Sequence, residues 1–336
     1  MKKLFSFFAV VAICFQLFAE TTDYPSFPSN TRLRVVGSNV NNYLSDFEAS
    51  NASCKSQAAF DDKTDKMATV FVGLQADIVA LCEVQEDDYI LDYIVDAMNK
   101  KVGSNVYDKV MDGATYNNPA PGEYGNIKSG YIFRCDKLTE GIPESTNKND
   151  KTFRYRMQVV TFTERATKEK FVLSVNHFKA YTEGASQRKV QATRLTEALK
   201  KNYGDPDILI VGDLNAEVSE ESVNSIITAG YEEQLLKYDS KAYTYVYKGQ
   251  RELIDHAMAN SSMASQITGA YVYHIPSSVD YSDHDCYVVG INLGGTDIDE
   301  VTANTTVPQR KLVYRNGQIL IQLDETFYDM MGRKIE

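Results

Sequence analysis

Polar residues at the ends of short apolar runs are the part of this sequence suited to chemistry. Each run is rich in Val, Ile or Leu and leads to a carboxylate, an amide or an imidazole. The residues placed in this way are Asn39, Glu83, His177, Asp213, Asn215, Asp255, Asp283 and His284. Taken singly, each is equally well explained as a cap or turn residue. Packed sheets gather strand ends at one rim, so we expect these side chains to lie close together.

A rim of this composition predicts a metal site. Several carboxylates and two imidazoles concentrate negative charge, and such crowding is costly when no cation offsets it. Carboxylate and amide oxygens are the ligands that hard divalent cations prefer. The sequence therefore predicts bound Mg²⁺, with Ca²⁺ or Mn²⁺ as further candidates.

The elements that must position these residues alternate between strands and helices. Hydrophobic periodicity predicts helices near residues 67–74, 90–98 and 192–199. It predicts strands over residues 32–40, 77–81, 130–134, 158–163, 171–177, 207–211, 243–247, 254–259, 270–273 and 286–293. A polar turn between strands 158–163 and 171–177 indicates an antiparallel hairpin. Such a pattern is typical of mixed sheets packed with helices.

Three motifs in a fixed order resemble those of the endonuclease/exonuclease/phosphatase superfamily. They are Gly212-Asp213-Leu214-Asn215, Leu253-Ile254-Asp255-His256 and Ser282-Asp283-His284-Asp285. The segments that contain Asn39 and Glu83 fit the same superfamily, and the resemblance runs from about residue 32 to residue 293. The segments 175–179 and 243–250 look most like its extracellular bacterial nuclease branch, which points to nucleic acid rather than phospholipid.

The resemblance implies an α/β fold, a four-layer α/β sandwich of two packed mixed β-sheets flanked by helices. It also implies that Glu83 is the principal metal ligand, with Asn39 and Asp283 close by. Metal and hydrogen-bond donors would together stabilise the charge that builds on the phosphoryl oxygens. A covalent enzyme intermediate is not required.

The same resemblance suggests roles for the remaining residues. Asp255 would orient His284, which would take a proton from water or contact the phosphate. Asp213 and Asn215 would position the nucleophile and stabilise the expanding phosphorus centre. His177 would contact the phosphate or assist the leaving oxygen, so the two histidines share the acid and base work collectively.

One segment departs from the family pattern. In pancreatic-type deoxyribonucleases a carboxylate upstream of the strand equivalent to 130–134 braces the first histidine, whereas this chain has Asn126-Ile127-Lys128 there. Glu123 is the nearest substitute. A histidine without a carboxylate brace would be less stabilised as imidazolium, and the pH optimum would fall.

Basic residues near the motifs are the candidates for substrate binding. Arg156 begins a strand where the family often places a phosphate-binding arginine, and Lys179 and Arg188 follow His177 in sequence. The alternative for all three is solvated surface charge, which is the usual role of scattered lysines and arginines.

Two further groups receive structural interpretations. His256 follows Asp255 on an alternating strand and therefore points to the opposite side, which favours a structural histidine. The side chains of Tyr243, Tyr245 and Tyr247 share one strand face and suit stacking on bases, but a tyrosine row at period two is more typical of a half-buried strand.

The two ends of the chain differ from its centre. Lys2 and Lys3 precede an uncharged apolar run that ends at Ala19, a pattern typical of a cleavable signal peptide. Asn316-Gly317 between two apolar segments predicts a β-hairpin near the C-terminus. The expected organisation is a signal peptide at 1–19, a catalytic domain at 20–295, a linker at 296–310 and a small tail at 311–336. We expect a secreted protein, extracellular or in the periplasm or at the cell surface of a Gram-negative bacterium.

Composition limits the choice of partners. The 336-residue chain carries a formal charge of −11, and removal of Lys2 and Lys3 would leave 33 basic residues against 46 acidic ones, a charge of −13. Nucleic acid is repelled at long range by such a protein unless a metal or a basic rim reverses the local sign. Cys54, Cys82, Cys135 and Cys286 remain after processing; their spacing matches no zinc motif, and three disulfide connectivities are open.

These observations predict a secreted, metal-dependent nuclease that hydrolyses phosphodiester bonds of DNA by internal cleavage, with RNA as the alternative polymer. A secreted phosphatase or phospholipid phosphodiesterase of the same fold is the second reading, because this fold serves several substrates. The absence of Trp and of an exposed apolar hairpin disfavours a lipid surface. An inactive binding module is the remote alternative, since the chain retains every acid, amide and imidazole that the chemistry needs.

Overall fold

The computed structural model describes residues 24–87, 89–111, 127–142 and 158–294, together with residues 311–315, 318–323, 326–328 and 334–335 of the C-terminal segment. The signal peptide predicted at 1–19, the linker predicted at 296–310, Glu123 and Arg156 lie outside the described residues. The chain divides into two units, residues 1–294 and 295–336, and each is described by itself.

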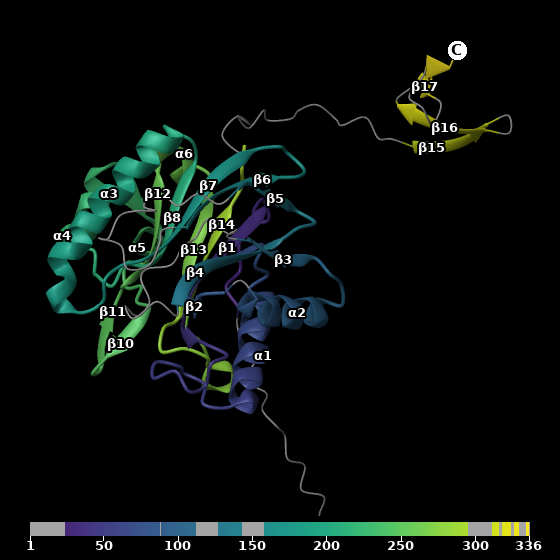
Figure 1. The fold of residues 1–336 in the computed structure, drawn as a ribbon. Helices are drawn as coiled ribbons and strands as arrows, with labels where there is room; N and C mark the ends of the chain where they lie inside the picture. Colours follow the sequence, from purple (N-terminus) through teal and green to yellow (C-terminus); the bar gives the residue numbers. More distant parts are fainter. Residues whose placement is uncertain are drawn as a thin grey trace, which may run out of the picture. The chain divides into compact units, whose positions relative to one another are not determined.

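The first large sheet holds the N-terminal strands and the last strands of the first unit. Its order is β13 (Ile267–Tyr273), β14 (Cys286–Ile291), β1 (Leu33–Tyr43), β2 (Ile78–Gln85), β4 (Ile127–Arg134) and β3 (Tyr107–Lys109). Strands β1 and β2 are parallel, and the other neighbours are antiparallel. Two strands from opposite ends of the unit thus lie side by side at the centre of the sheet (Figure 1).

The second large sheet has the order β5 (Leu138–Glu140), β6 (Gln158–Glu164), β7 (Lys170–His177), β8 (Ile208–Asp213), β12 (Asp255–Asn260) and β9 (Tyr231–Glu233). Strands β6 and β7 form the expected antiparallel hairpin, and β7 and β8 are parallel. Each sheet therefore contains one parallel pair, whose strands end at the same edge.

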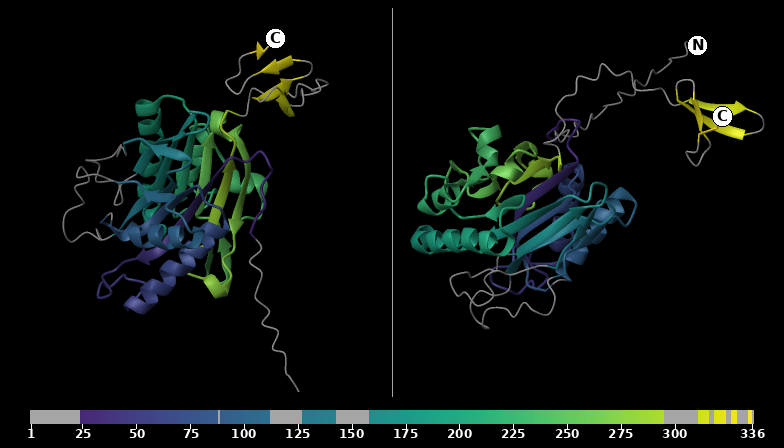
Figure 2. Two further views of the ribbon diagram at one scale, coloured as in Figure 1. Left: turned by 90° about the vertical axis from the view of Figure 1, so that its right-hand side faces the viewer. Right: turned by 90° about the horizontal axis from the view of Figure 1, so that it is seen from above.

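Helices cover the outer face of each sheet, which gives four layers (Figures 1 and 2). Alternation along β1 illustrates the division, because Val35 joins the core between the sheets while Val36 joins the core under the helices. The helices are α1 (Gln57–Gly73), α2 (Ile90–Val102), α3 (Ala185–Tyr203), α4 (Glu221–Thr228), α5 (Gln234–Tyr238) and α6 (Ser261–Ala264), with 3-10 turns at Thr182–Gly184 and Ser277–Val279. The predicted four-layer α/β sandwich is confirmed.

Two buried tyrosines connect the sheets. The Tyr287 hydroxyl on β14 donates to the carbonyl of His256 at 2.8 Å and accepts from the amide of Gly212 at 2.8 Å. The Tyr131 hydroxyl on β4 accepts from the amide of Val175 at 2.7 Å. A buried polar group is costly unless it is hydrogen-bonded, so these contacts fix how one sheet lies on the other.

The predicted boundaries are wrong where the apolar pattern is weak. Helix α1 begins ten residues before the apolar repeat, at Gln57, because the Ser56 hydroxyl caps it by accepting from the amide of Ala59 at 3.3 Å. The strand predicted at 243–247 is shorter, β10 (Tyr245–Tyr247), and forms a separate two-stranded sheet with β11 (Gln250–Glu252).

The C-terminal unit is a small antiparallel sheet rather than a single hairpin. Its order is β15 (Lys311–Arg315), β16 (Gln318–Leu323), β17 (Thr326–Tyr328) and β18 (Lys334–Ile335). Arg315 pairs directly with Gln318, as the Asn-Gly signal predicts. Two further strands extend this hairpin into a four-stranded sheet. A two-stranded ribbon alone is only marginally stable, so the added strands stabilise it.

The four cysteines after the predicted signal peptide are free thiols. Cys54, Cys82 and Cys286 are buried, and Cys135 is half-buried, so none of the three disulfide connectivities is present. Cys82 and Cys286 lie within apolar strands, where each is a small buried apolar side chain. Among the described residues, no helix is both long and apolar enough to cross a membrane.

Candidate active site

The strand ends converge at one edge of the two packed sheets. Across the parallel pairs, Asn39 lies opposite Cys82, the neighbour of Glu83, and His177 lies opposite Asp213. Strand β12 runs antiparallel to β8 and places Asp255 directly beside Asp213. The topology therefore delivers residues from both sheets to one rim, as the sequence predicts.

A first cluster contains Glu83, His177 and Asp213, whose potential ligand atoms all lie within 4.8 Å of one another. The His177 Nε2 atom is 3.7 Å from Glu83 Oε1 and 3.7 Å from Asp213 Oδ2. The side-chain amide of Asn39 donates to Glu83 Oε1 at 3.1 Å and to Asp213 Oδ2 at 2.9 Å. Asn39 thus connects the carboxylate of one sheet to the carboxylate of the other.

The irregular end of β1 also holds Glu83 in place. Glu83 has a positive φ of 67°, and Asn41 and Asn42 have φ values of 46° and 48°. Backbone of this kind is uncommon outside glycine and persists where the surroundings enforce it. The amide of Asn42 donates to Glu83 Oε2 at 2.8 Å, and the buried ammonium of Lys63 donates to the carbonyl of Asn41 at 3.0 Å.

The carboxylates of this cluster are electrostatically strained. Burial raises the pKa of Glu83 above its usual value, although hydrogen bonds from Asn39 and Asn42 act in the opposite direction. Burial, followed by the charge of Asp255, also raises the pKa of Asp213. Both shifts mean that the ionised forms are destabilised and that a nearby cation would stabilise them.

A second cluster contains Asp213, Asp255 and His284. His284 Nδ1 lies 2.8 Å from Asp255 Oδ2, and both side chains are buried. The amide of Asp255 in turn donates to the hydroxyl of Thr244 at 3.1 Å. This carboxylate–imidazole pair has the geometry of an oriented acid–base group.

The charge state of His284 follows from its neighbours. Burial alone would lower its pKa, but the charge and hydrogen bond of Asp255, with further contributions from Asp213 and Asp283, outweigh it and raise the pKa to about 10. The imidazole is therefore protonated at neutral pH when no cation occupies the rim.

Asn215 and Asp283 lie at the margin of the site. The amide of Asn215 donates to Asp213 Oδ1 at 2.8 Å, and its side chain donates to the carbonyl of Phe178 at 3.2 Å. Asp283 is exposed and belongs to neither of the two clusters. Its predicted role as a metal ligand stays a prediction.

Arg188 is buried and fully engaged with neighbouring groups, and its predicted contact with substrate stays a prediction. Only 3% of its surface is exposed, and its guanidinium donates to both carboxylate oxygens of Glu220, at 2.8 and 2.5 Å. The remaining nitrogen donates to the carbonyls of Lys179 and Tyr181 at 2.8 and 2.6 Å. Arg188 thus holds the loop after β7, and Lys179, half-buried with its ammonium 5.8 Å from the Tyr181 ring centre, remains a candidate.

The other two described histidines are outside the clusters. His256 is buried with Nε2 2.8 Å from the carbonyl of Ala216, as its alternation with Asp255 predicts. His274 is half-exposed and pairs with Asp285 at 2.6 Å. Neither lies among the groups that could hold a metal ion.

Three residues at the site were not singled out as site residues from the sequence. Thr244 orients Asp255, and the ring of Tyr245 lies 4.7 Å from the ring of His284, centre to centre. Thr244 and Tyr245 belong to the segment 243–250, whose tyrosine row predicts a half-buried strand. Lys63 gave no signal, because its burial against the end of β1 depends on tertiary packing alone.

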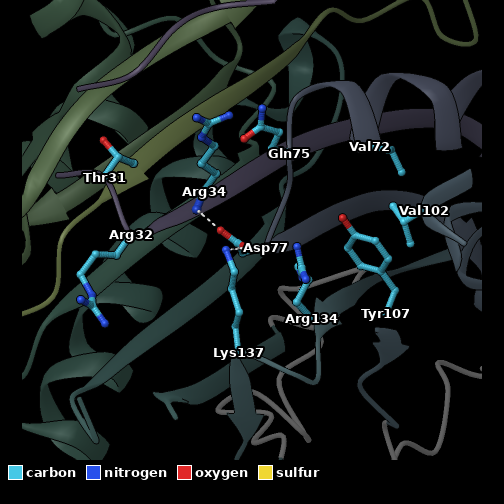
Figure 3. A pocket seen from close by; sticks show the side chains of 10 residues that line it. All are labelled: Thr31, Arg32, Arg34, Val72, Gln75, Asp77, Val102, Tyr107, Arg134 and Lys137. Carbon is cyan, nitrogen blue, oxygen red and sulfur yellow. Dashed lines mark hydrogen bonds and ion pairs between the residues drawn. The ribbon is translucent and has the colours of Figure 1, made fainter. Parts of the chain in front are cut away.

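A pocket at the other end of the first sheet is separate from this site (Figure 3). It lies around Arg34, five residues before Asn39 on β1 and so about 16 Å away along the strand. Its cations are paired, Arg32 with Glu164 at 2.7 Å and Lys137 with Asp77 at 2.7 Å, and the amide of Arg34 also donates to Asp77 at 2.9 Å. These contacts join segments at the sheet edge.

Comparison with known proteins agrees with the geometry. The model of the Endonuclease/Exonuclease/phosphatase family matches residues 39–284, which include both clusters. No curated protein sequence matches this chain.

Solved structures share the fold at low sequence identity. An endonuclease/exonuclease/phosphatase from Bacteroides vulgatus aligns with a TM-score of 0.58 and 15% identity, over 76% of this chain and 97% of the other. A mannosyl-6-phosphatase from Bacteroides thetaiotaomicron gives 0.57 and 15%, over 77% and 99%. D. rerio TDP2 complexed with a single-strand DNA product gives 0.53 and 15%, over 76% and 97%. The chain belongs to the endonuclease/exonuclease/phosphatase family and has the fold of hydrolases that act on phosphoester bonds.

Proposed function

We propose that the protein is a metal-dependent nuclease that hydrolyses phosphodiester bonds of DNA, by internal cleavage. The observation that carries the proposal is Asp213, which is shared between the Glu83–His177 cluster and the Asp255–His284 pair. This one buried carboxylate thereby lies within 4.8 Å of both His177 and His284.

The residues present fit a divalent cation. Asp213 is buried and Glu83 is half-buried, both have raised pKa values, and hard cations prefer carboxylate oxygen ligands. Glu83 would hold the ion with Asn39 and Asp283, and Mg²⁺ is the candidate that the donor set favours. When bound, the ion would offset negative charge on the phosphoryl oxygens and on the leaving oxygen.

The side chains of the site divide the proton transfers. Asp213, whose raised pKa makes it a better base than an exposed aspartate, takes a proton from the attacking water as the new P–O bond forms. Asn215 helps to position that water. The protonated His284, fixed through Nδ1 by Asp255, leaves Nε2 to contact a phosphate oxygen or to protonate the alkoxide as the old P–O bond breaks. His177 shares this work.

Electrostatics favour a diester over a monoester. Near neutral pH a phosphate diester carries one negative charge, whereas a monoester carries up to two. Three carboxylates surround the two histidines, so the more highly charged monoester is repelled more strongly. The fold shared with D. rerio TDP2, whose structure contains a single-strand DNA product, supports the choice of a nucleic acid strand.

A phosphatase is the second candidate. The observation in its favour is the similar fold of the Bacteroides thetaiotaomicron mannosyl-6-phosphatase, which aligns over 99% of its length. Both reactions use the same rim, so the groups attached to the phosphorus decide between them. We further propose that the protein is secreted, on the basis of the apolar N-terminal run after Lys2 and Lys3.

A substrate panel separates the two candidates. The mature protein is assayed with Mg²⁺ on an oligodeoxynucleotide, on the same oligonucleotide carrying a 5′-phosphate, and on mannose 6-phosphate. The nuclease proposal predicts internal cleavage of the first two with the terminal phosphate retained. Release of inorganic phosphate with no chain cleavage would favour the phosphatase.

A further inference from the structure

A narrow aromatic hairpin lies beside His284. Strands β10 and β11 pair directly at Tyr247 and Gln250 and are joined by Lys248 and Gly249, both at positive φ (48° and 83°). This is the geometry of a two-residue turn whose twist matches the strands, and glycine suits its second position. The hairpin forms its own two-stranded sheet (Figure 1).

The base of the hairpin is attached to the catalytic residues. The amide of Thr244 donates to the carbonyl of Glu252 at 3.0 Å, and its own carbonyl accepts from the amide of Asp285 at 2.7 Å. Tyr245 forms a β-bridge with His284. These contacts fix the position of the hairpin relative to the imidazole of His284.

Aromatic rings form a row that leads away from His284. The ring of Tyr245 lies 4.7 Å from the imidazole, and the ring of Tyr247 lies 6.5 Å from that of Tyr245 with an angle of 12° between the planes. Tyr245 is half-buried, while 51% of Tyr247 is exposed. About half of the Tyr247 side chain is therefore accessible to a ligand.

The chemistry of the row fits one class of partner. Planar bases stack on tyrosine faces with little dependence on sequence, and cations beside the rings suit the adjoining phosphates. The ammonium of Lys248 lies 4.9 Å from the centre of the Tyr247 ring, and the guanidinium of Arg251 lies 4.4 Å from that of Tyr243. The row begins 4.7 Å from the His284 imidazole and continues one ring spacing of 6.5 Å to Tyr247.

We propose that the β10–β11 hairpin is a base-stacking arm, in which Tyr247 stacks on an unpaired nucleobase next to the scissile phosphate. The inference rests on the proposed nuclease function and adds a substrate class to it: strands or junctions whose bases are not paired. The Tyr245 ring lies between the Tyr247 ring and the imidazole of His284, and it supports both.

The test uses the full mature protein and three matched oligodeoxynucleotides. Each is single-stranded with one hydrolysable phosphodiester among methylphosphonate linkages; one is complete, and the other two lack the base on the 5′ or the 3′ side of that bond. The variants are Tyr247→Ala, Tyr247→Phe and, as a matched partly exposed tyrosine on α5, Tyr238→Ala. Melting temperatures confirm that each variant is folded.

If the hairpin stacks on a base, Tyr247→Ala should raise KM for the complete strand about 10-fold, as expected for the loss of one stacked base. The kcat of the variant should stay within twofold of that of the unaltered protein. The same change leaves KM unaltered on one of the two strands that lack a base. Tyr247→Phe, which keeps the ring, and Tyr238→Ala keep the KM of the unaltered protein.

Other outcomes overturn the inference. Equal losses on all three strands would mean that Tyr247 acts without a base, and unchanged KM values would mean that it does not contact the substrate. Cleavage of phosphatidylcholine vesicles impaired by Tyr247→Ala would assign the hairpin to a lipid surface. If the unaltered protein cleaves none of the strands, the proposed nuclease function fails first, which distinguishes that failure from failure of the arm.

Discussion

Asp213 joins the two halves of the site, since its carboxylate lies 3.7 Å from His177 and accepts from Asn39 at 2.9 Å. Burial and the neighbouring Asp255 disfavour its ionised form. A protein without metal must therefore accommodate the negative charges of the rim with the protonated His284 beside them. The rim is built for bound cations and is less stable without them.

Loss of one carboxylate should have opposite effects on activity and on stability. Glu83→Gln should weaken metal activation by about 100-fold, because a ligand to a metal contributes at least as much as the groups that orient it. In EDTA the same variant should melt at a higher temperature, because a buried charge has been removed. Glu169→Gln, an exposed carboxylate elsewhere, is the control. A lower melting temperature of Glu83→Gln in EDTA would contradict the account.

The pKa of His284 predicts how stability changes with pH. Its folded value of about 10 exceeds the ordinary value of 6.5, so the folded state binds the extra proton between these limits. The stabilisation is complete below pH 6.5 and is lost as the pH rises through 10. In EDTA, urea unfolding should show this decline for the unaltered protein and a flatter profile for His284→Gln. Parallel profiles would show that His284 is not protonated in the fold.

The sequence was sufficient to predict that these polar residues share one rim but not how each side chain is used. The cluster forms because polar residues at the ends of apolar strand runs reach the same edge of the two packed sheets, and it contains Asn39, Glu83, His177, Asp213, Asp255 and His284. Arg188 could not be placed, because its partner Glu220 lies 32 residues away and only packing brings the two together. Asp283 shows the same limit, since its exposure depends on the course of the loop before β14.

At the scale of elements, the contact between β1 and β14 leaves no room for a side chain at Gly37. A Cβ atom there would lie 2.1 Å from the Tyr287 ring, which is held between the sheets by its hydroxyl. Small residues at such positions permit the close packing that fixes both sheets.

Gly37→Ala should therefore destabilise the protein by about 1–3 kcal/mol or more, the usual cost of overpacking a core. Gly103→Ala is the comparison, because no atom lies within 4 Å of its Cβ and only its positive φ opposes the change. Urea unfolding would measure both. Equal losses at the two positions would mean that Tyr287 moves aside freely.

Element prediction succeeded where burial is two-sided. The runs over β8, β14 and the first five residues of β2 are almost wholly apolar because both faces of each strand are covered. Three-residue strands such as β3, β9 and β11 are too short to show a period, and the first half of α1 is polar where it faces solvent. Tertiary pairing alone defines these segments.

At the scale of the whole molecule, the fold does not depend on cross-links. The four cysteines of the described catalytic unit are free thiols, and its cores lie between and outside two large sheets. A catalytic unit of this size buries enough apolar surface to be stable without staples.

We expect dithiothreitol to leave the melting temperature of the mature protein unchanged. Thiol titration in denaturant should find four reactive groups per chain, and titration of the folded protein should find fewer because three of the thiols are buried. A melting temperature that falls by several degrees on reduction would reveal a disulfide and contradict this description.

The overall charge of −11 makes the local site decisive for a nucleic acid substrate. A polyanion is repelled at long range by this protein, so productive binding requires cations at the rim and contacts near it. The account therefore places both affinity and catalysis at the metal-binding edge of the sheets.

Cleavage of supercoiled plasmid DNA tests this claim most directly. The mature protein is incubated with Mg²⁺ and Ca²⁺, or with EDTA, alongside His284→Ala and the matched histidine variant His274→Ala. The account predicts nicking that requires metal, is lost in His284→Ala and is retained in His274→Ala. Intact plasmid under every condition, or nicking that survives either EDTA or His284→Ala, would contradict it.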